Sequence, residues 1–257
     1  MTASDEGVAV GIVGASETSA LAETLSRRDE TYLAGGARDV CSRARDLVVA
    51  VGREALLAVA NERPTAPVLP VETGRGVESV GAMAVPPALD AVLDGDPRAH
   101  RHPLLSVAVD GESVGTAFGD VTLVTGEPAR ISEFAIDHDK RVATVRADGV
   151  VIATPAGSAA YATDAGGPVL APGIDAVSVV PIAPFHTLDR RWVLDPERLS
   201  VAVLRDEERV SLRCDGRERA TLSSPDRVTF VREATVTTVL PRVDQKHSNG
   251  PTSDTRP

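Results

Sequence analysis

The sequence predicts an α/β N-terminal domain with a parallel sheet, followed by an all-β C-terminal domain. In the first part, β-branched apolar runs alternate with stretches of helical spacing, which is the pattern of a parallel sheet covered by helices. In the second part, helical spacing nearly disappears and short apolar runs are separated by turn signals such as Asp110-Gly111 and Asp215-Gly216. We therefore expect domains at residues 1–103 and 104–240, and a disordered tail at 241–257.

The expected elements follow from the apolar pattern of each run. In the N-terminal part we expect strands at 7–14, 47–51 and 67–71 and helices at 16–27 and 53–61. A proline-rich crossing with a short helix at 88–93 should lead into the second domain, where His100 and His102 are expected to be exposed. The C-terminal strands are expected at 106–109, 121–124, 142–146, 176–180, 198–204, 210–213 and 228–231.

Composition excludes several classes of protein. The formal net charge of −10 argues against a nucleic-acid partner, because binding to phosphates needs positive charge. No apolar run approaches the roughly 20 residues that span a bilayer, and no secretory signal is visible, so we expect a cytoplasmic protein. Only Lys140 and Lys246 are lysine among 27 basic residues, a bias that indicates salt adaptation. The two cysteines and five histidines lack the spacing of metal ligands, and we expect no metal site.

The most informative stretch is 146–168. Val150–Ile152 reads as a buried strand that ends at Pro155, because proline cannot donate to a strand ladder. Gly157 permits a tight turn, and Ser158 is expected to cap a short helix that reaches Tyr161. Such a connection directs backbone N–H groups toward a phosphate or a ribose oxygen. The competing interpretation is an ordinary glycine-rich connection with a capping serine.

The same residues resemble the signature of the NAD kinase family. That family has Asp-Gly, an apolar strand, Thr-Pro-Thr-Gly-Ser-Thr-Ala-Tyr and then Ala-Gly-Gly-Pro. The matching positions, at the same spacing, are Asp148-Gly149, Thr154-Pro155, Gly157-Ser158, Ala160-Tyr161 and Ala165-Gly166-Gly167-Pro168. Ala156 and Ala159 stand where the family has threonine.

The resemblance implies the two-domain NAD kinase fold and an interdomain site for NAD(H) or NADP(H). It further implies phosphorylation of the adenosine ribose 2′-hydroxyl by ATP with Mg²⁺, and assembly into a homodimer or homotetramer. Carboxylates can accept hydrogen bonds from ribose hydroxyls, and arginines can bind a pyrophosphate. The residues expected to bind the dinucleotide are Asp120, Arg130, Arg146, Asp148, Gly157, Ser158, Ala159, Ala160, Tyr161, Asp164 and Arg217.

The catalytic motif departs from the family pattern. The resemblance places Arg53 where the Gly-Gly-Asp-Gly motif has the aspartate that acts as the base, and Gly119 where the family has asparagine. Arginine stays protonated and cannot act as a base. A shift of one residue would bring the Glu54 carboxylate into that role, which makes Glu54 the candidate catalytic residue. The competing interpretation of Glu54 is a solvated residue in a first helical turn.

Two alternative functions follow from this departure. Loss of the aspartate is also compatible with a catalytically inactive NAD(P)-binding sensor or regulatory paralogue. A phosphotransferase acting on another polyol or lipid would keep the two-domain plan but not the dinucleotide.

Overall fold

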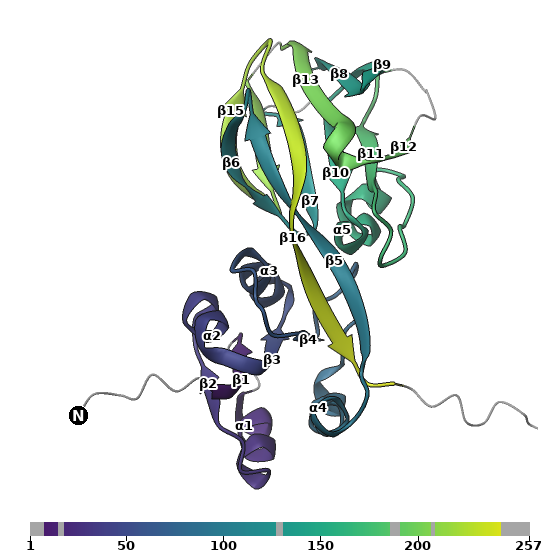
Figure 1. The fold of residues 1–257 in the computed structure, drawn as a ribbon. Coiled ribbons are helices and arrows are strands. Elements are labelled where there is room, and N and C mark those ends of the chain that lie inside the picture. Colours follow the sequence, from purple (N-terminus) through teal and green to yellow (C-terminus); the bar gives the residue numbers. More distant parts are fainter. Residues whose placement is uncertain (1–7, 15–17, 127–130, 186–190, 207–208, 243–257) are drawn as a thin grey trace, which may run out of the picture.

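The chain folds into two parts joined by a pair of long strands (Figure 1). The structure is a computed structural model and describes residues 8–14, 18–126, 131–185, 191–206 and 209–242. Within these residues the strands form one sheet of ten strands and one of six. None of the described helices is both long enough and apolar enough to cross a membrane.

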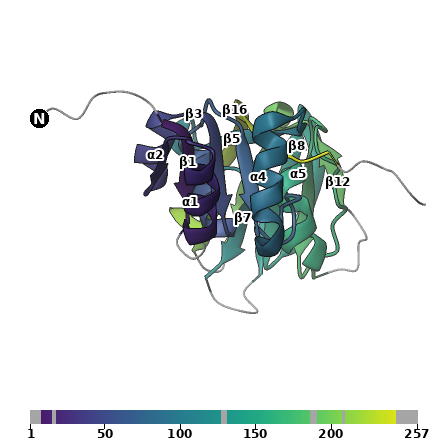
Figure 2. The same cartoon turned by 90° about the horizontal axis from the view of Figure 1, so that it is seen from below.

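The N-terminal part is a parallel sheet in the order β2-β1-β3-β4. Helices α1 and α4 cover one face, where Leu21 and Leu89 pack with Leu47, and run side by side (Figure 2). Helices α2 and α3 cover the other face. The bounds are β1 Val8–Val13, α1 Thr18–Arg27, β2 Tyr32–Ala34, α2 Ala37–Arg43, β3 Ala44–Val51, α3 Arg53–Asn61, β4 Val68–Val71, a 3₁₀ turn η1 Ala82–Ala84 and α4 Val85–Asp94.

Strands β5 (Arg98–Val109) and β16 (Arg227–Leu240) join the two parts. They pair antiparallel along their whole length, and Figure 1 shows them running from the helical part into the β part. One end of β16 lies beside β4, through the pairing of Thr238 with Val68, and the other end lies beside β13. The large sheet is therefore continuous across both parts.

The C-terminal part consists of two packed antiparallel layers. The six-stranded sheet has the order β12-β11-β10-β7-β14-β15 and lies against the β16-β13-β8-β9 end of the large sheet. The interface between them is an apolar core that includes Phe134, Phe230, Leu123 and Ile152. The bounds are β6 Glu112–Ala117, β7 Asp120–Thr125, β8 Ser132–His138, β9 Lys140–Ala147, β10 Gly149–Ala153, α5 Pro155–Gly157, η2 Ser158–Ala162, β11 Val177–Ile182, β12 Trp192–Leu194, η3 Pro196–Arg198, β13 Leu199–Arg205, β14 Val210–Cys214 and β15 Arg217–Leu222.

The predicted fold class is confirmed, and most predicted elements are present. The expected helix at 53–61 is α3, and the turns at Asp110 and Asp215 are two-residue hairpin loops with positive φ at both positions. The expected domain boundary at 103/104 falls inside β5. The apolar pattern missed elements that are short or charged, namely β2, α2, β6, β8, β12 and β15. Of the expected tail, residues 243–257 lie outside the described part of the chain.

The expectation that His102 is exposed is wrong. His102 lies in β5 with only 2% of its surface exposed, and its Nε2 lies 3.0 Å from the Thr238 hydroxyl of β16. Its ring also contacts Phe118, with 5.6 Å between ring centroids. Burial, reinforced by the neighbouring His100, lowers the pKa of His102 to about 4. The sequence signal was misread because the prolines around it were taken as a crossing loop.

We expect the interlayer core to dominate the stability of the β part. Replacing Phe230, which is 1% exposed, by alanine should lower the free energy of unfolding by about 3–5 kcal/mol, because it leaves a cavity between the layers. The neighbouring Val231 is 56% exposed, so Val231→Ala is a control that should change it by less than about 0.5 kcal/mol. Urea unfolding of both variants measures the difference. Equal losses would contradict this assignment of the core.

Candidate functional site

A cavity of about 450 Å³ lies where the N-terminal end of α3 faces strands β7 and β14. Both parts of the molecule contribute to it, α3 from the helical part and the strands from the β part. Its acidic and aromatic groups, Asp120, Asp215, Glu54 and Tyr161, are accompanied by two arginines. The lining residues are Arg53, Glu54, Leu57, Asp120, Thr122, Val124, Tyr161, Arg213, Asp215 and Gly216.

The Asp215 carboxylate holds the start of β7 in place. It accepts hydrogen bonds from the backbone N–H groups of Phe118, Gly119 and Asp120, at 2.8, 2.7 and 3.1 Å. Asp215 lies at positive φ in the two-residue turn between β14 and β15, which directs its side chain back over β7. The Asp215 N–H in turn donates to the Asp120 carbonyl at 2.9 Å.

The signature loop, residues 154–164, packs directly against the segment that precedes β7. The Thr154 hydroxyl donates to the carbonyls of Phe118 and Gly119, at 2.6 and 3.0 Å. A Cβ on Gly157 would lie 2.1 Å from the Gly119 carbonyl oxygen, so a side chain at 157 does not fit. Glycine at 157 is therefore required by the close approach of two backbone segments.

Asp120 is a buried residue of the cavity wall, with 7% of its surface exposed. Burial raises the pKa of Asp120 to about 6, the charge of Asp215 adds to this, and the charge of Arg53 opposes it. Burial also raises the pKa of Asp215, whereas its three backbone hydrogen bonds and the charge of Arg53 lower it. Arg53 is thus the cation that stabilises both carboxylates.

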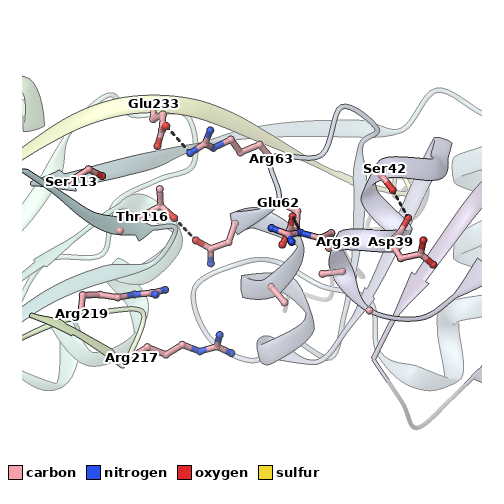
Figure 3. A pocket seen from close by; sticks show the side chains of 15 residues that line it. Arg38, Asp39, Ser42, Glu62, Arg63, Ser113, Thr116, Arg217, Arg219 and Glu233 are labelled. Atoms are coloured by element: carbon pink, nitrogen blue, oxygen red, sulfur yellow. Dashed lines mark hydrogen bonds and ion pairs between the residues drawn. The ribbon is translucent and has the colours of Figure 1, made fainter.

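A second, more open cavity of about 840 Å³ adjoins this site along α3 (Figure 3). Four arginines line it, and Arg217 and Arg219 extend into it from β15. Three of the four arginines have carboxylate partners: Arg38 with Glu62 at 3.7 Å, Arg63 with Glu233 at 2.6 Å and Arg217 with Glu54 at 3.5 Å. The Arg217–Glu54 pair connects the two cavities, since each cavity is lined by one of its members.

Comparison with known proteins identifies the family. Residues 118–240 match the family model of the ATP-NAD kinase C-terminal domain. The chain is 34% identical over 226 residues to an NAD kinase of Chromohalobacter salexigens, covering 81% of this chain and 76% of that relative. It is 31% identical over 197 residues to an NAD kinase of Methanosarcina acetivorans, covering 74% and 70%. The chain belongs to the NAD kinase family.

Other relatives share the fold, and some are matched over only part of their own length. The alignment with the NAD kinase of Methanosarcina mazei, at 32% identity, spans 67% of this chain and only 62% of that relative. The structure of a yeast NADH kinase in complex with NADH has a TM-score of 0.76 at 17% identity, covering 93% of this chain and 85% of that one. An NAD kinase from Archaeoglobus fulgidus in complex with ATP has a TM-score of 0.74 at 21% identity, covering 89% and 92%.

The residues predicted from the NAD kinase signature lie in several different places. Asp120, Tyr161 and Glu54 line the 450 Å³ cavity. Arg217 pairs with Glu54 at the boundary between the cavities, and half-buried Ala159 and Ala160 lie beside Tyr161 in the loop. Asp164 forms an ion pair with Arg75 at 3.2 Å, which ties the loop to the Gly-Arg turn after β4.

Two other predicted residues, Asp148 and Arg146, lie away from the end of the cavity that holds Asp120. In the antiparallel pair of β7 and β10, Asp120 is opposite Ala153, whereas Gly149 is opposite Val124. Asp148 precedes Gly149 and therefore lies about five residues along the ladder from Asp120, or about 17 Å. Arg146 lies at that same far end, with its guanidinium 5.2 Å from the centre of the Phe185 ring. Arg130 lies outside the described residues.

The predicted cap at Ser158 is wrong. The helix begins at Pro155 after Thr154, and the backbone continues as the π-type turn η2. The buried Ser158 hydroxyl donates to the Pro155 carbonyl at 3.0 Å and accepts from the Leu170 N–H at 2.9 Å. The N–H groups of Gly157 and Ser158 both donate to the Thr154 carbonyl, so they do not point at a ligand. Ser158 and Gly157 shape the loop.

Sequence reasoning missed four residues that build the site. Asp215 was not among the predicted site residues, although a turn aspartate can accept backbone hydrogen bonds. Arg213 and Thr122 face each other across β14 and β7, and alternation along these strands could have indicated that they share a face. Nothing in the spacing of Arg75 indicated its contact with Asp164.

The contact between the loop and Gly119 should be sensitive to a single methyl group. Gly157→Ala is expected to lower the free energy of unfolding by about 1–3 kcal/mol, because the loop must move away from the Gly119 carbonyl. Gly81→Ala is the matched control, since no atom lies within 4 Å of the added Cβ and φ is −74°. Urea unfolding of both variants provides the test. A Gly157→Ala protein as stable as the parent would show that the two backbones are not in this contact.

Burial of Asp120 should lower stability at neutral pH. Its folded pKa of about 6 exceeds the ordinary 3.8, so the charged form destabilises the fold above pH 6, and this effect disappears as the pH falls towards 3.8. Asp120→Asn should therefore raise the free energy of unfolding by up to about 3 kcal/mol at about pH 8, and by much less at about pH 4.5. The exposed Asp46 provides the control Asp46→Asn, which should change neither value. A gain that is the same at both pH values would contradict the assignment.

Proposed function

We propose that this chain binds NAD(H) or NADP(H) in the 450 Å³ cavity and, as an NAD kinase, transfers the γ-phosphoryl group of ATP to the 2′-hydroxyl of the adenosine ribose. The observation that supports this most directly is the grouping of Asp120, Asp215 and Tyr161 in one cavity between the two parts of the molecule. Family membership supports the same reaction. In this proposal the protein acts as the homodimer or homotetramer that the family resemblance implies.

Each group of the cavity has a chemical role in the proposal. The Asp120 carboxylate accepts hydrogen bonds from ribose hydroxyls, and Tyr161, 42% exposed, provides an aromatic wall for a ring of the dinucleotide. Asp148 and Arg146, at the far end of the ladder, are assigned to the other half of the dinucleotide. We assign the triphosphate of ATP to the adjoining cavity, because arginines match phosphate oxygens in geometry and charge.

Magnesium enters this proposal as part of the substrate. Among the described residues no group of three or more His, Cys, Asp or Glu side chains is arranged to hold a metal ion. The Mg²⁺ is therefore assigned to the triphosphate, as MgATP, where it offsets the phosphate charge. The chain's own contribution is to position the two substrates.

The second candidate is a dinucleotide-binding protein without kinase activity. It is favoured by Arg53, which stands at the family aspartate and lines the cavity. A guanidinium cannot accept a proton, so this residue cannot serve as the base. In this candidate the cavity binds the same ligand and the arginine cavity has no catalytic role.

One set of measurements separates these candidates. We expect calorimetric titration at high salt to detect binding of NAD or NADP, and we expect NADP to form from NAD and MgATP. Tyr161→Ala should weaken binding by about 0.5–1.5 kcal/mol through loss of an aromatic contact. Tyr32→Ala, in β2 and outside the cavity, is the matched control and should bind as the parent does.

The outcomes are distinct. Binding without NADP formation would favour the binding protein over the kinase. Absence of binding to either dinucleotide would exclude both candidates, and ATP consumption only with a non-nucleotide acceptor would favour a different phosphotransferase.

A further inference from the structure

The two departures from the family motif, at residues 53 and 119, lie against each other in space. A Cβ built on Gly119 would lie 3.3 Å from Nη2 of Arg53 and 3.0 Å from Oδ1 of Asp215. The Arg53 guanidinium therefore occupies the space into which a side chain at 119 would extend. An asparagine at 119 would crowd the Arg53 guanidinium in this arrangement, so the two departures are coupled through this contact.

This exchange places a cation beside Asp120. Arg53 acts on the charges of both Asp120 and Asp215. The other ionisable groups around Asp120 are Glu54 on α3, Arg213 and Cys214 on β14, and Tyr161 on η2. Among the residues that line this cavity, Asp120 and Glu54 are the carboxylates besides Asp215, whose oxygens are already engaged by three backbone N–H groups.

Glu54 is poorly suited to the role of base. Its side chain is 81% exposed and points to the ion pair with Arg217, at the boundary with the arginine cavity. Asp120 is buried in the cavity wall at the start of β7. Hydrogen bonds to Asp215 and Thr154 hold the backbone there. A buried carboxylate on a fixed backbone has fewer orientations to lose in the reaction, whereas an exposed one must be ordered first.

We propose that Asp120 is the base that takes the proton from the attacking hydroxyl, and that Arg53, seated beside Gly119, is a positioning residue whose positive charge acts on the Asp120 carboxylate. This inference rests on the proposed kinase function. It assigns the role of the missing aspartate to a residue on the opposite wall of the same cavity.

The O–H bond of the acceptor hydroxyl breaks, and its proton passes to the Asp120 carboxylate. The hydroxyl oxygen forms a bond to the γ-phosphorus of the nucleoside triphosphate. The bond from that phosphorus to the β,γ-bridging oxygen breaks, and its electron pair leaves on the nucleoside diphosphate. Asp120 returns its proton to water after product release.

The protonation behaviour of Asp120 agrees with this role. A base is most effective when its pKa lies near the working pH, and burial brings the pKa of Asp120 to about 6. The rate should therefore fall as the pH drops through about 6, because the carboxylate becomes protonated. Arg53 lowers the pKa of Asp120, so its removal should move this fall to higher pH.

The test compares steady-state NADP formation by the full chain and its variants across pH. Asp120→Asn should lower kcat by about 10²- to 10⁴-fold, and Asp46→Asn should keep the parental rate. Arg53→Ala should shift the acidic fall in rate to higher pH, and Arg53→Lys should restore its position by restoring the positive charge. Gly119→Asn should reproduce the effect of Arg53→Ala, because the new side chain displaces the guanidinium.

Several results would overturn the inference. An active parent protein whose Asp120→Asn variant keeps its rate removes Asp120 from the role of base, and the proposed function then stands alone. A Glu54→Gln variant that loses as much activity as predicted for Asp120→Asn, with Asp120→Asn active, assigns the base to Glu54. A parent protein that binds NAD but forms no NADP in this assay overturns the kinase function, and the inference with it.

Discussion

The Asp215 carboxylate is the interaction on which the site depends. It satisfies three consecutive backbone N–H groups that precede or begin β7, groups that would otherwise be buried without acceptors. With these amides held, the Phe118 and Gly119 carbonyls point the other way, toward Thr154. One side chain from the β14–β15 turn therefore determines how the start of β7 and the signature loop meet.

This arrangement also explains why the cavity tolerates two neighbouring buried carboxylates. Asp215 is stabilised by hydrogen bonds from the backbone, whereas Asp120 depends mainly on the guanidinium of Arg53. The space for that guanidinium exists because residue 119 has no side chain. Packing and electrostatics thus make residues 53, 119 and 120 interdependent, and a change at one alters the conditions for the others.

The sequence predicted the fold class and the location of the site better than the contacts within it. Apolar periodicity identified β1, β3, β4 and α3 because each has one buried face or is buried throughout. The signature stretch identified the loop because its residues match the NAD kinase signature at the same spacing. That Arg53 enters the space beside Gly119 depends on a contact between segments far apart in the chain, for which local patterns hold no signal.

The β5–β16 ladder has a consequence for how the two halves of the molecule can move. Its register shifts once, between Arg232 and Ala234, so Glu233 is an extra residue in an otherwise regular pair of strands. A continuous ladder resists a free hinge, and the bulge is where it flexes most easily. The Arg63–Glu233 ion pair, at 2.6 Å, connects that point to the helical half. Bending of the two strands at Glu233 would change the width of the interdomain opening, and the Arg63–Glu233 ion pair would oppose that bending.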